Sequence, residues 1–533
     1  MIGTVALLVV ADVILVNGRV VTLDGKRPRA TAVAIAGDRI AAVGGDREVR
    51  ELRGPRTRVV DLKKRTVVPG LVDAHAHLLS LGQMLETVDL RGTTSAAEVV
   101  DRVKRAARRP GDWIIGRGWD QNDWPDAAFP HRRLLDAALA DRPVLLTRID
   151  GHAVWVSSAA LRRANVGAKT PDPAGGRILR EGGEPTGVLV DTAIDLIEKH
   201  VPRPDAATRE RRLRAAIDRC VELGLTGVHD MGVEAETFEV LRRMAREGQL
   251  KIRVYAVGSH EEAEATLAGK PELGPHLTRR AVKLYADGAL GSRGAALLED
   301  YRDDPGNRGL ELIEPKRLVD LARRAHAGGW QLAVHAIGDR ANRVVLDAFE
   351  QALGADLSRA RFRIEHAQVV SPADLPRFAR TGVIASMQPT HATSDMPWAE
   401  QRLGKERLVG AYAWQTLLRS GARLAFGSDF PIEEVNPLLG LYAAISRQDE
   451  RGGPKGGWMP AERLGIEDAL RGFTAGAAYA AFEENERGTL RPGMSADLTI
   501  FDGDLLGADP RTLLKRKVIA TMVGGRFVYG PAK

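Results

Sequence analysis

The chain has 533 residues, of which 44% are hydrophobic and 28% are charged, a composition typical of globular proteins with packed cores. Its 77 basic residues exceed its 70 acidic ones by a small surplus, which is spread over helix-like stretches such as Asp101–Arg109 and Arg209–Arg219. This distribution indicates solvated helix faces and argues against a nucleic-acid-binding protein. A single cysteine, Cys220, excludes an intramolecular disulfide and fits a reducing compartment.

The chain opens with an apolar segment, Val5–Val10. No basic region precedes it, no cleavage pattern follows it, and it is far shorter than the roughly 20 residues that span a bilayer. We therefore expect a first β-strand here, no membrane segment and a cytoplasmic location.

Residues 10–68 contain short apolar runs separated by turns. The run ADVILV leads through Asn17-Gly18, a dipeptide typical of hairpins, into RVVTL. A turn at Gly37-Asp38 joins TAVAIA to RIAAVGG, and the pair Lys63-Lys64 joins TRVVDL to TVVPG. The pattern predicts a small antiparallel sheet.

The far end of the chain repeats this pattern in GTLRPG, ADLTIFDG and KVIATMVGGRFVYG. Neither end has enough strands to form a stable sandwich alone. We therefore predict one composite β-sandwich domain built from residues 1–68 and 484–533.

Between the two ends, short apolar runs alternate with helix-like stretches such as Pro315–Gly328 and Ala341–Leu353, a pattern that predicts a parallel sheet. The expected strands are Val67–Leu78, Thr226–Gly232, Ile252–His260, Ala281–Gly288, Gln331–Asp339, Arg361–Gln368, Gly382–Pro389 and Ala422–Pro431. Eight such units predict an α/β fold, a (β/α)8 TIM-like barrel, over residues 69–88 and 205–483. The long interval after the first strand predicts an inserted subdomain, residues 89–204, that caps the active site.

The first barrel strand, VVPGLVDAHAHL, ends in two histidines one residue apart. Because side chains alternate along a strand, His75 and His77 point to the same side, with Cα atoms about 6.6 Å apart. Two imidazoles at this spacing can converge on one metal ion.

Active sites of such barrels lie at the C-terminal ends of the strands. At those ends the sequence places Lys283 on strand four, His335 on strand five, His366 on strand six and Asp429 on strand eight. Imidazole and carboxylate ligands suit zinc and other borderline divalent ions.

Each of these residues has an alternative interpretation. His335 and His366 could be satisfied core histidines, Asp429 could cap the following helix, and Lys283 could pair with Asp287. His229 on strand two is better interpreted as a packing residue, or as one that supports a ligand from behind, than as a ligand.

The motifs together resemble the amidohydrolase superfamily, and within it the amidohydrolase-3 or YtcJ-like group, which includes N-substituted formamide deformylase. The motifs that carry this resemblance are PGLVDAHAHL, GWDQNDW, DGHAVWVSSAAL, VKLYADGALGSRGAAL, HAIGDRAN, EHAQ, GSDFP and RGTLRPGMSADLTIFDGD. The resemblance covers nearly the whole chain and implies the same barrel with a composite sandwich.

Carried over to this sequence, the resemblance implies a buried metal held by His75 and His77 with Asp429 nearby. It implies a second metal held by His335 and His366, with Lys283 as a bridging ligand in carbamate form. One or two divalent ions, zinc foremost, are thus the expected cofactors. The implied reaction is hydrolysis of a C–N bond in an amide, formamide or cyclic amide, with Asp429 as general base and then acid.

Three further residues, Trp119, His152 and Arg293, are weaker candidates for substrate contacts, and the insert's tryptophans suggest an apolar or aromatic substituent on a small-molecule amide. Two other functions stay open. A deaminase on the same scaffold is disfavoured because Gly338 occupies the position of the glutamate that deaminase relatives carry. A catalytically silent binding or regulatory barrel is the other alternative. We expect no nucleic-acid or membrane partner, and a homodimer stays open because no surface patch can be identified from one chain.

Overall fold

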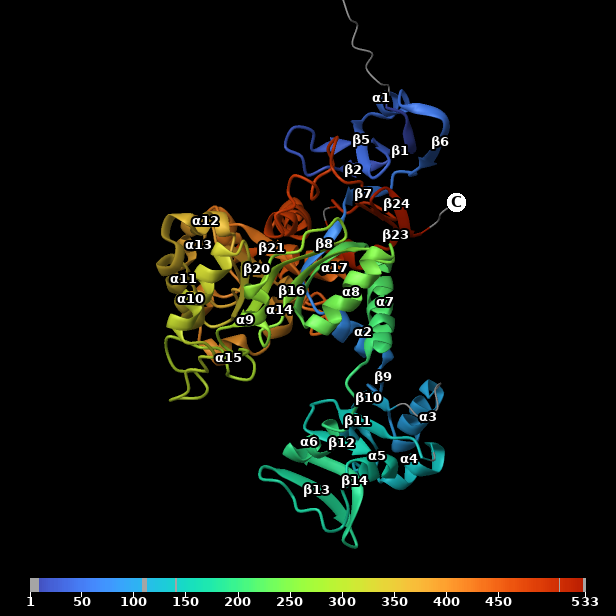
Figure 1. Cartoon of the computed structure of the whole chain (residues 1–533), viewed down its shortest axis with the longest axis vertical. Coiled ribbons are helices and arrows are strands. Elements are labelled where there is room, and N and C mark those ends of the chain that lie inside the picture. The colour runs from blue at the N-terminus through green and yellow to red at the C-terminus, as the bar shows by residue number, and fades with distance from the viewer. Residues whose placement is uncertain (1–8, 108–112, 140, 508, 531–533) are drawn as a thin grey trace, which may run out of the picture. The chain divides into compact units, whose positions relative to one another are not determined.

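The computed structural model describes residues 9–107, 113–139, 141–507 and 509–530 (Figure 1). The chain divides into two compact units, of which one comprises Met1–Leu78 with Arg214–Lys533 and the other comprises Leu79–Leu213. The predicted strand over Val5–Val10 falls largely outside the described residues. Val9 and Val10 are described, are more than half exposed and precede the first strand.

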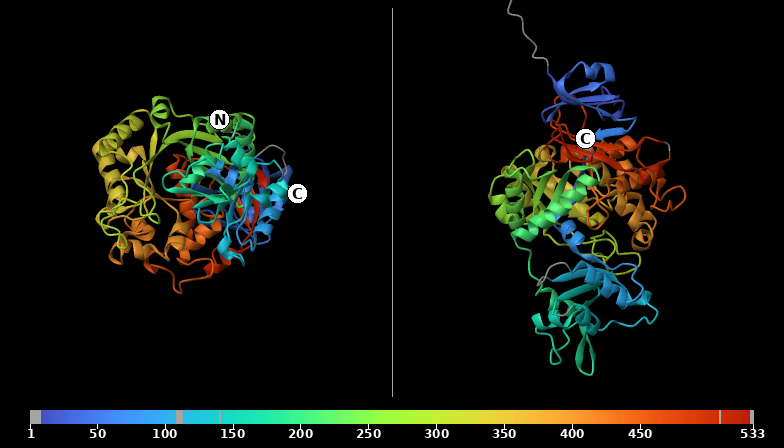
Figure 2. Two further views of the ribbon diagram at one scale, coloured as in Figure 1. Left: turned by 90° about the horizontal axis from the view of Figure 1, so that it is seen from below. Right: turned by 90° about the vertical axis from the view of Figure 1, so that its right-hand side faces the viewer.

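The larger unit contains a sheet of eight parallel strands that curls into a barrel (Figure 2). In spatial order the strands are β8 (Leu71–Ala76), β15 (Leu225–Val233), β16 (Arg253–Gly258), β17 (Leu277–Tyr285), β18 (Gln331–Ala336), β19 (Arg363–His366), β20 (Ile384–Met387) and β21 (Leu424–Phe426). Each predicted run overlaps one of these strands, so the predicted α/β barrel is confirmed.

The residues that follow β21 bring it against β8 and nearly close the barrel. Asp429 N donates to the His75 carbonyl at 2.7 Å, and His77 N donates to the Phe430 carbonyl at 3.0 Å. The buried Asp73 carboxylate accepts hydrogen bonds from the backbone N and Oγ of Ser428. These contacts fix the ends of the first and last strands, where the predicted ligands lie.

Helices connect the strands and pack outside them (Figure 2). They are α7 (Ala206–Glu222), α8 (Ala235–Arg246), α9 (Ala263–Ala268), α10 (Pro315–Ala327), α11 (Asp339–Leu353), α12 (Leu357–Ala360), α13 (Leu375–Thr381), α14 (Pro389–Asp395), α15 (Ala399–Leu403), α16 (Trp414–Arg419), α17 (Pro437–Ser446), α18 (Ile466–Arg471) and α19 (Ala477–Ala480). Helix α10 shows why they form. Leu318, Leu321, Ala322 and Ala325 recur at helical spacing and are buried, while arginines and lysine occupy the other face.

The larger unit has two further sheets, one built from the N-terminal end alone and the other from both ends of the chain. One sheet has the order β5-β4-β1-β6 and the other the order β24-β23-β22-β7-β2-β3. Their strands are β1 (Ala11–Val16), β2 (Arg19–Val21), β3 (Arg29–Ala30), β4 (Ala32–Ala36), β5 (Arg39–Gly44), β6 (Arg53–Asp61), β7 (Thr66–Pro69), β22 (Leu498–Phe501), β23 (Val518–Val523) and β24 (Arg526–Tyr529). One apolar core contains residues from both ends, including Leu15, Val33, Leu498 and Met522, so the composite domain is confirmed.

The pairing inside this domain differs from the prediction at two turns. Of the three predicted turns, only the one at Gly37-Asp38 joins neighbouring antiparallel strands, β4 and β5. The segments at Asn17-Gly18 and Lys63-Lys64 instead carry the chain from one sheet to the other, so that β1 pairs with β6 and β2 with β7 in parallel. Lys64 N donates to the Asn17 carbonyl, which holds the two crossings side by side. The hairpin prediction is wrong because burying both faces of the apolar runs requires two packed sheets.

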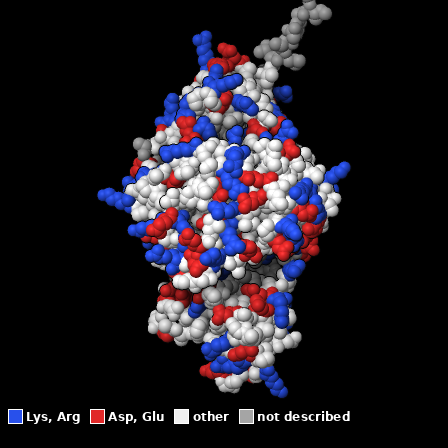
Figure 3. Space-filling view, turned by 90° about the vertical axis from the view of Figure 1, so that its left-hand side faces the viewer, with Lys and Arg blue, Asp and Glu red and all other residues white. Residues whose placement is uncertain are grey.

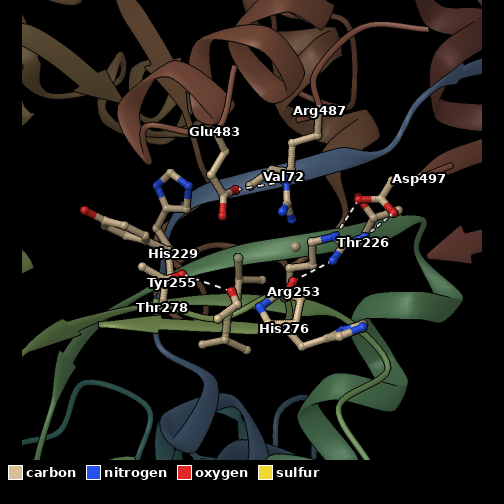
Figure 4. Close-up of a pocket in the computed structure, with 15 residues that line it drawn as sticks. Val72, Thr226, His229, Arg253, Tyr255, His276, Thr278, Glu483, Arg487 and Asp497 are labelled. Carbon is tan, nitrogen blue, oxygen red and sulfur yellow. Dashed lines mark hydrogen bonds and ion pairs between the residues drawn. The ribbon is translucent and has the colours of Figure 1, made fainter. Parts of the chain in front are cut away.

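A narrow pocket lies at the N-terminal ends of the barrel strands, under the terminal sheet (Figure 4). There Asp497 accepts hydrogen bonds from Arg253 Nε and Nη2 at 2.7 and 2.9 Å, and Arg487 lies 3.2 Å from Glu483. The Arg253–Asp497 pair fastens the composite domain to the barrel at the end opposite to the predicted ligands.

The smaller unit has one six-stranded sheet of order β13-β14-β12-β11-β10-β9. Its elements are α2 (Leu78–Glu86), β9 (Val88–Asp89), α3 (Ala96–Ala106), β10 (Ile114–Trp119), α4 (Arg132–Leu139), β11 (Val144–Arg148), β12 (Ala153–Val156), α5 (Ser158–Arg163), β13 (Gly176–Glu181), β14 (Glu184–Asp191) and α6 (Asp195–Glu198). Trp119, Trp124 and Trp155 pack together in its core.

Charged side chains of both signs are interspersed on the face drawn in Figure 3, as expected of solvated helix faces. The basic stretch Arg209–Arg219 lies on α7. The stretch Asp101–Arg109 lies on α3 as far as Ala106, and Arg108 and Arg109 fall outside the described residues. Among the described helices, none combines the length and the apolar character needed to cross a bilayer.

Candidate metal centre

The four predicted histidine ligands lie side by side at the C-terminal ends of the barrel strands. The ring centroids of His75 and His77 are 5.7 Å apart, those of His75 and His366 are 4.8 Å apart, and those of His335 and His366 are 4.6 Å apart. Asp429 joins them, with its Oδ1 3.5 Å from His75 Nε2 and 3.0 Å from His77 Nε2. Parallel strands thus gather into one cluster residues that are up to 354 positions apart.

Three of these histidines are held through Nδ1. His75 Nδ1 lies 2.6 Å from Glu365 Oε2, His77 Nδ1 lies 3.0 Å from the Met231 carbonyl, and His366 Nδ1 lies 2.7 Å from Gln388 Oε1. All three partners are oxygen acceptors, so each Nδ1 carries the hydrogen. The Nε2 lone pairs are left for a metal, an arrangement typical of histidine ligands with supporting partners.

The resulting geometry is suited to a cation. His77 Nε2 and Asp429 Oδ1 face each other at 3.0 Å, and Asp429 Oδ1 is buried without a hydrogen-bond partner among the described residues. Two lone pairs at this separation repel unless a proton or a metal ion lies between them. The ligand atoms of His75, His77 and Asp429 all lie within 4.8 Å of one another, and their two imidazoles and one carboxylate are a donor set that fits a borderline divalent ion.

Burial favours the neutral form of His75, His335 and His366. It lowers the pKa of His75 and His366 well below the ordinary value, with Lys283 and neighbouring imidazoles adding to the effect. Burial and Lys283 together lower the pKa of His335 to about 3. Neutral imidazole is the form that ligates metals, so no proton has to leave before binding.

Asp429 is a carboxylate in this setting. Burial alone would raise its pKa, but a proton shared with the imidazoles of His75, His77 and His391 favours the ionised carboxyl and holds the pKa well below its ordinary value. The alternative that Asp429 caps the next helix is wrong, because the following helix, α17, is capped by the side chain of Asn436.

Lys283 is fully buried beside this cluster, with Nζ 3.4 Å from His75 Nε2. Burial lowers its pKa to about 8, although Glu365 and Asp429 oppose the shift. The alternative pairing with Asp287 is not formed. The Asp287 carboxylate instead accepts hydrogen bonds from the backbone N of Ala296, Ile337 and Gly338 at 2.8–2.9 Å.

His335 is turned toward that same loop. Its Nε2 lies 3.4 Å from the Gly288 carbonyl and 3.4 Å from Asp287 Oδ1. Its ring therefore contacts the cluster through His366, while its Nε2 is engaged outside it.

A buried polar network supports the cluster from inside the barrel. Arg363 on β19 donates to Glu365, to the Ala74 carbonyl and to Ser386 Oγ, and its Nη1 lies 2.8 Å from His229 Nδ1. His229 thus has a supporting position, as predicted. The roles of Arg363 and Glu365 were missed by the sequence reasoning, although charged residues alternating on a barrel strand were a usable signal.

His391, on α14 after the seventh strand, was also missed. Its Nε2 lies 3.8 Å from Asp429 Oδ2, and its ring stacks on that of His366. It was overlooked because it follows Gln388-Pro389 on a helix and not at the end of an apolar strand.

The three weaker substrate-binding candidates each have a partner within their own unit. Trp119 is fully buried in the core of the smaller unit, with its Nε1 donating to the Leu146 carbonyl. His152, in the same unit, is exposed and lies 2.9 Å from Asp191. Arg293, in the loop after β17, pairs with Asp303. The burial of the tryptophans gives no support to a role of their rings in binding a substituent.

Comparisons with known proteins agree with this geometry. Residues 58–529 match the amidohydrolase family. The chain is 36% identical over 527 residues to putative amidohydrolase YtcJ of Bacillus subtilis, covering 96% of this chain and 98% of that protein. It is 29% identical to N-substituted formamide deformylase of Arthrobacter pascens, covering 97% and 98% of the two chains. The crystal structure of an uncharacterized metal-dependent hydrolase from Pyrococcus horikoshii superposes with a TM-score of 0.79 at 31% identity, covering 93% of this chain and 99% of the other.

Proposed function

The chain belongs to the amidohydrolase family, and from that premise we propose that this metal-dependent hydrolase cleaves a C–N bond in an amide, a formamide or a cyclic amide. The observation that carries the proposal is the triad of His75, His77 and Asp429, whose free nitrogen and oxygen atoms converge on one point. The similarity to a formamide deformylase over nearly the whole chain supports N-substituted formamides as the first substrates to try.

His75, His77 and Asp429 would hold the metal ion, with zinc as the proposed species. A divalent cation bound there lowers the pKa of a water molecule and polarises the scissile carbonyl. In this proposal Asp429 accepts the proton of the attacking water and then donates it to the leaving nitrogen.

The proposed role of Lys283 is that of a carbamate. With a pKa of about 8 its amine is partly neutral near pH 7, which is the form that adds carbon dioxide. The addition joins the amine nitrogen to the carbon of carbon dioxide and releases one proton, and it replaces a cation beside His75 by an anion.

The deaminase alternative has less support. Gly338 takes the position where deaminase relatives carry a proton-donating glutamate. The following residue, Asp339, uses its Oδ1 to accept hydrogen bonds from the backbone N of Leu298 and Arg340. A silent barrel is disfavoured because the ligand atoms of the triad are all in place.

Hydrolysis of a panel of N-substituted formamides, acetamides and cyclic amides tests the proposal. We expect release of formate or another carboxylate from at least one class, loss of turnover after chelation and recovery with added zinc. Ammonia release without carboxylate would support the deaminase instead. Metal binding without turnover of any C–N substrate would support the silent barrel.

A further inference from the structure

His391 belongs to the metal centre without having an assigned role. It lies on α14, seven residues that follow β20, and its side chain is only 13% exposed. Its Nε2 is buried and has no hydrogen-bond partner among the described residues. A buried imidazole nitrogen left without a partner is costly, so a native structure that keeps one calls for an explanation.

The position of α14 is fixed by the surrounding chain. At its end, Asp395 Oδ2 accepts hydrogen bonds from Gln368 Nε2 at 2.9 Å and from the Tyr412 hydroxyl at 2.7 Å. Ser394 Oγ lies 2.6 Å from Glu433 Oε1. The helix is thus anchored on three sides, which holds His391 in place beside the cluster.

His391 lies next to two other candidate ligands, His366 and Asp429. Its ring stacks on that of His366 at 5.8 Å with an interplanar angle of 20°, and its Nε2 lies 3.8 Å from Asp429 Oδ2. Because Gln388 occupies His366 Nδ1, the Nε2 of His366 is the nitrogen left for a metal. One ligand atom from each of His366, His391 and Asp429 lies within 4.8 Å of the others.

Asp429 divides its two oxygens between two groups of histidines. Oδ1 lies against His75 and His77, whereas Oδ2 lies toward His391. A carboxylate with one oxygen in each group can bridge two cations. In a tetrahedral zinc site, ligand atoms lie about 3.4 Å apart, so both groups need only small side-chain movements to close on an ion.

The ligand set that the resemblance implies for a second metal, His335, His366 and Lys283, does not point its donor atoms at one position. His335 turns its Nε2 toward Gly288 and Asp287, and the Nζ of Lys283 lies beside His75. His391, by contrast, has a free nitrogen directed at the cluster. The two candidate ligand sets for the second metal therefore differ in His391 on one side and Lys283 on the other, and each of these residues can be replaced by itself.

We propose that His366, His391 and Asp429 hold a second divalent cation of the zinc class, next to the one held by His75, His77 and Asp429, with the Asp429 carboxylate bridging the two. The inference rests on the proposed function, because it assumes that the first group is a metal site. It gives His391 the role of a ligand.

Metal counting on the full-length protein tests this assignment. Wild type and His391→Ala are stripped of metal, incubated with Zn²⁺ or Co²⁺ and desalted, and bound metal is counted by inductively coupled plasma mass spectrometry. We expect two equivalents in wild type and one in His391→Ala, with the second binding step weakened at least about 100-fold, since even a supporting partner costs 10–100-fold. The Co²⁺ absorption spectrum of the second equivalent, measured alongside, should disappear in the variant.

The controls separate the two donor sets. His326→Ala, on the outer helix α10, should keep two equivalents, and so should Lys283→Met. His391→Asp, which restores an oxygen donor, should regain part of the second step. If circular dichroism shows that His391→Ala does not fold, His391→Asn replaces it in the same metal-counting experiment.

Two equivalents in His391→Ala, or loss of the second equivalent in Lys283→Met alone, would overturn the assignment. One equivalent in wild type, with activity abolished by chelation, would also overturn it while leaving the hydrolase intact. No bound metal in wild type would overturn both this assignment and the proposed function.

Discussion

His75 Nδ1 and Glu365 Oε2 lie 2.6 Å apart across the inside of the barrel, and both side chains are almost completely buried. Glu365 is ionised there. Burial alone would raise its pKa, but Arg363 and Lys283 outweigh burial and lower it. The carboxylate therefore fixes the hydrogen on His75 Nδ1 and directs Nε2 to the metal centre.

Replacing Glu365 by Gln should weaken the first metal-binding step about 10–100-fold while leaving the fold intact, because the amide keeps the shape but loses the charge that orients His75. Isothermal titration with Zn²⁺ measures the affinity, and circular dichroism checks the fold. Glu486→Gln, at an exposed ion pair with Arg39, serves as the control and should bind metal like wild type. Unchanged affinity in Glu365→Gln would refute the orienting role.

Arg363→Met should destabilise the protein by about 3–5 kcal/mol at pH 7, because it leaves the buried Glu365 charge without its main partner. Arg359→Met, at an arginine that is 85% exposed, should change stability by no more than about 0.5 kcal/mol. Urea-unfolding midpoints provide the comparison.

The buried pair Arg363–Glu365 also predicts how the free energy of unfolding depends on pH. Since the pKa of Glu365 is lowered by folding, its contribution to stability is present above the ordinary value of 4.5 and is lost as pH falls below it. In Arg363→Met burial dominates, so Glu365 can take up a proton and relieve the penalty as the medium is acidified. The stability gap between variant and wild type should narrow from pH 7 to pH 5. A gap that stays constant or widens would contradict this account.

Asp429→Asn should lower kcat about 10²–10⁴-fold on whichever amide is turned over, because the amide cannot accept the proton of the attacking water. The Asn oxygen still offers one ligand atom, so the first metal ion should be retained, whereas the second, which needs the bridging carboxylate, should be weakened; activity is therefore compared at matched occupancy of the first site. Asp504→Asn, at an exposed carboxyl, should retain wild-type turnover. Activity of Asp429→Asn within fivefold of wild type would rule out the general-base role.

Lys283 should form a carbamate that increases with pH between 6.5 and 9 at constant carbon dioxide pressure. Its pKa of about 8 means that the neutral amine, the reactive form, rises through this range, whereas an ordinary lysine would stay protonated. ¹³C NMR of protein equilibrated with ¹³CO₂ should show a carbamate resonance that Lys283→Met lacks. A spectrum of wild type identical to that of Lys283→Met would exclude the modification.

Asp497→Ala should cost about 3–5 kcal/mol, since Asp497 is buried and accepts hydrogen bonds from Arg253 and from Gly524 N, which ties the composite domain to the barrel. The exposed pair Arg19–Asp504 provides the control, and Asp504→Ala should cost no more than about 1 kcal/mol. Thermal unfolding measured on both variants makes the comparison. Equal losses would show that the buried pair does not fasten the two parts.

The barrel strands were predictable because each is a short apolar run whose ends carry turn residues or helix-forming stretches. The positions of the candidate ligands followed from the same fact, since His75, His77, Lys283, His335, His366 and Asp429 stand at or near the C-terminal ends of those runs. The two crossings at Asn17-Gly18 and Lys63-Lys64 were not predictable, because a turn dipeptide specifies a change of direction but not which sheet receives the next strand.

The sequence by itself determined which chemical groups the barrel presents at one end, because the periodicity of apolar residues fixes the strands and the strands fix where their last side chains lie. Only the tertiary structure decided how those groups are held. Glu365 reaches His75 across 290 positions of sequence, Asp429 places one oxygen toward each histidine group, and His391 enters from a helix. Such contacts join side chains from different strands and loops, and they form only when the barrel nearly closes.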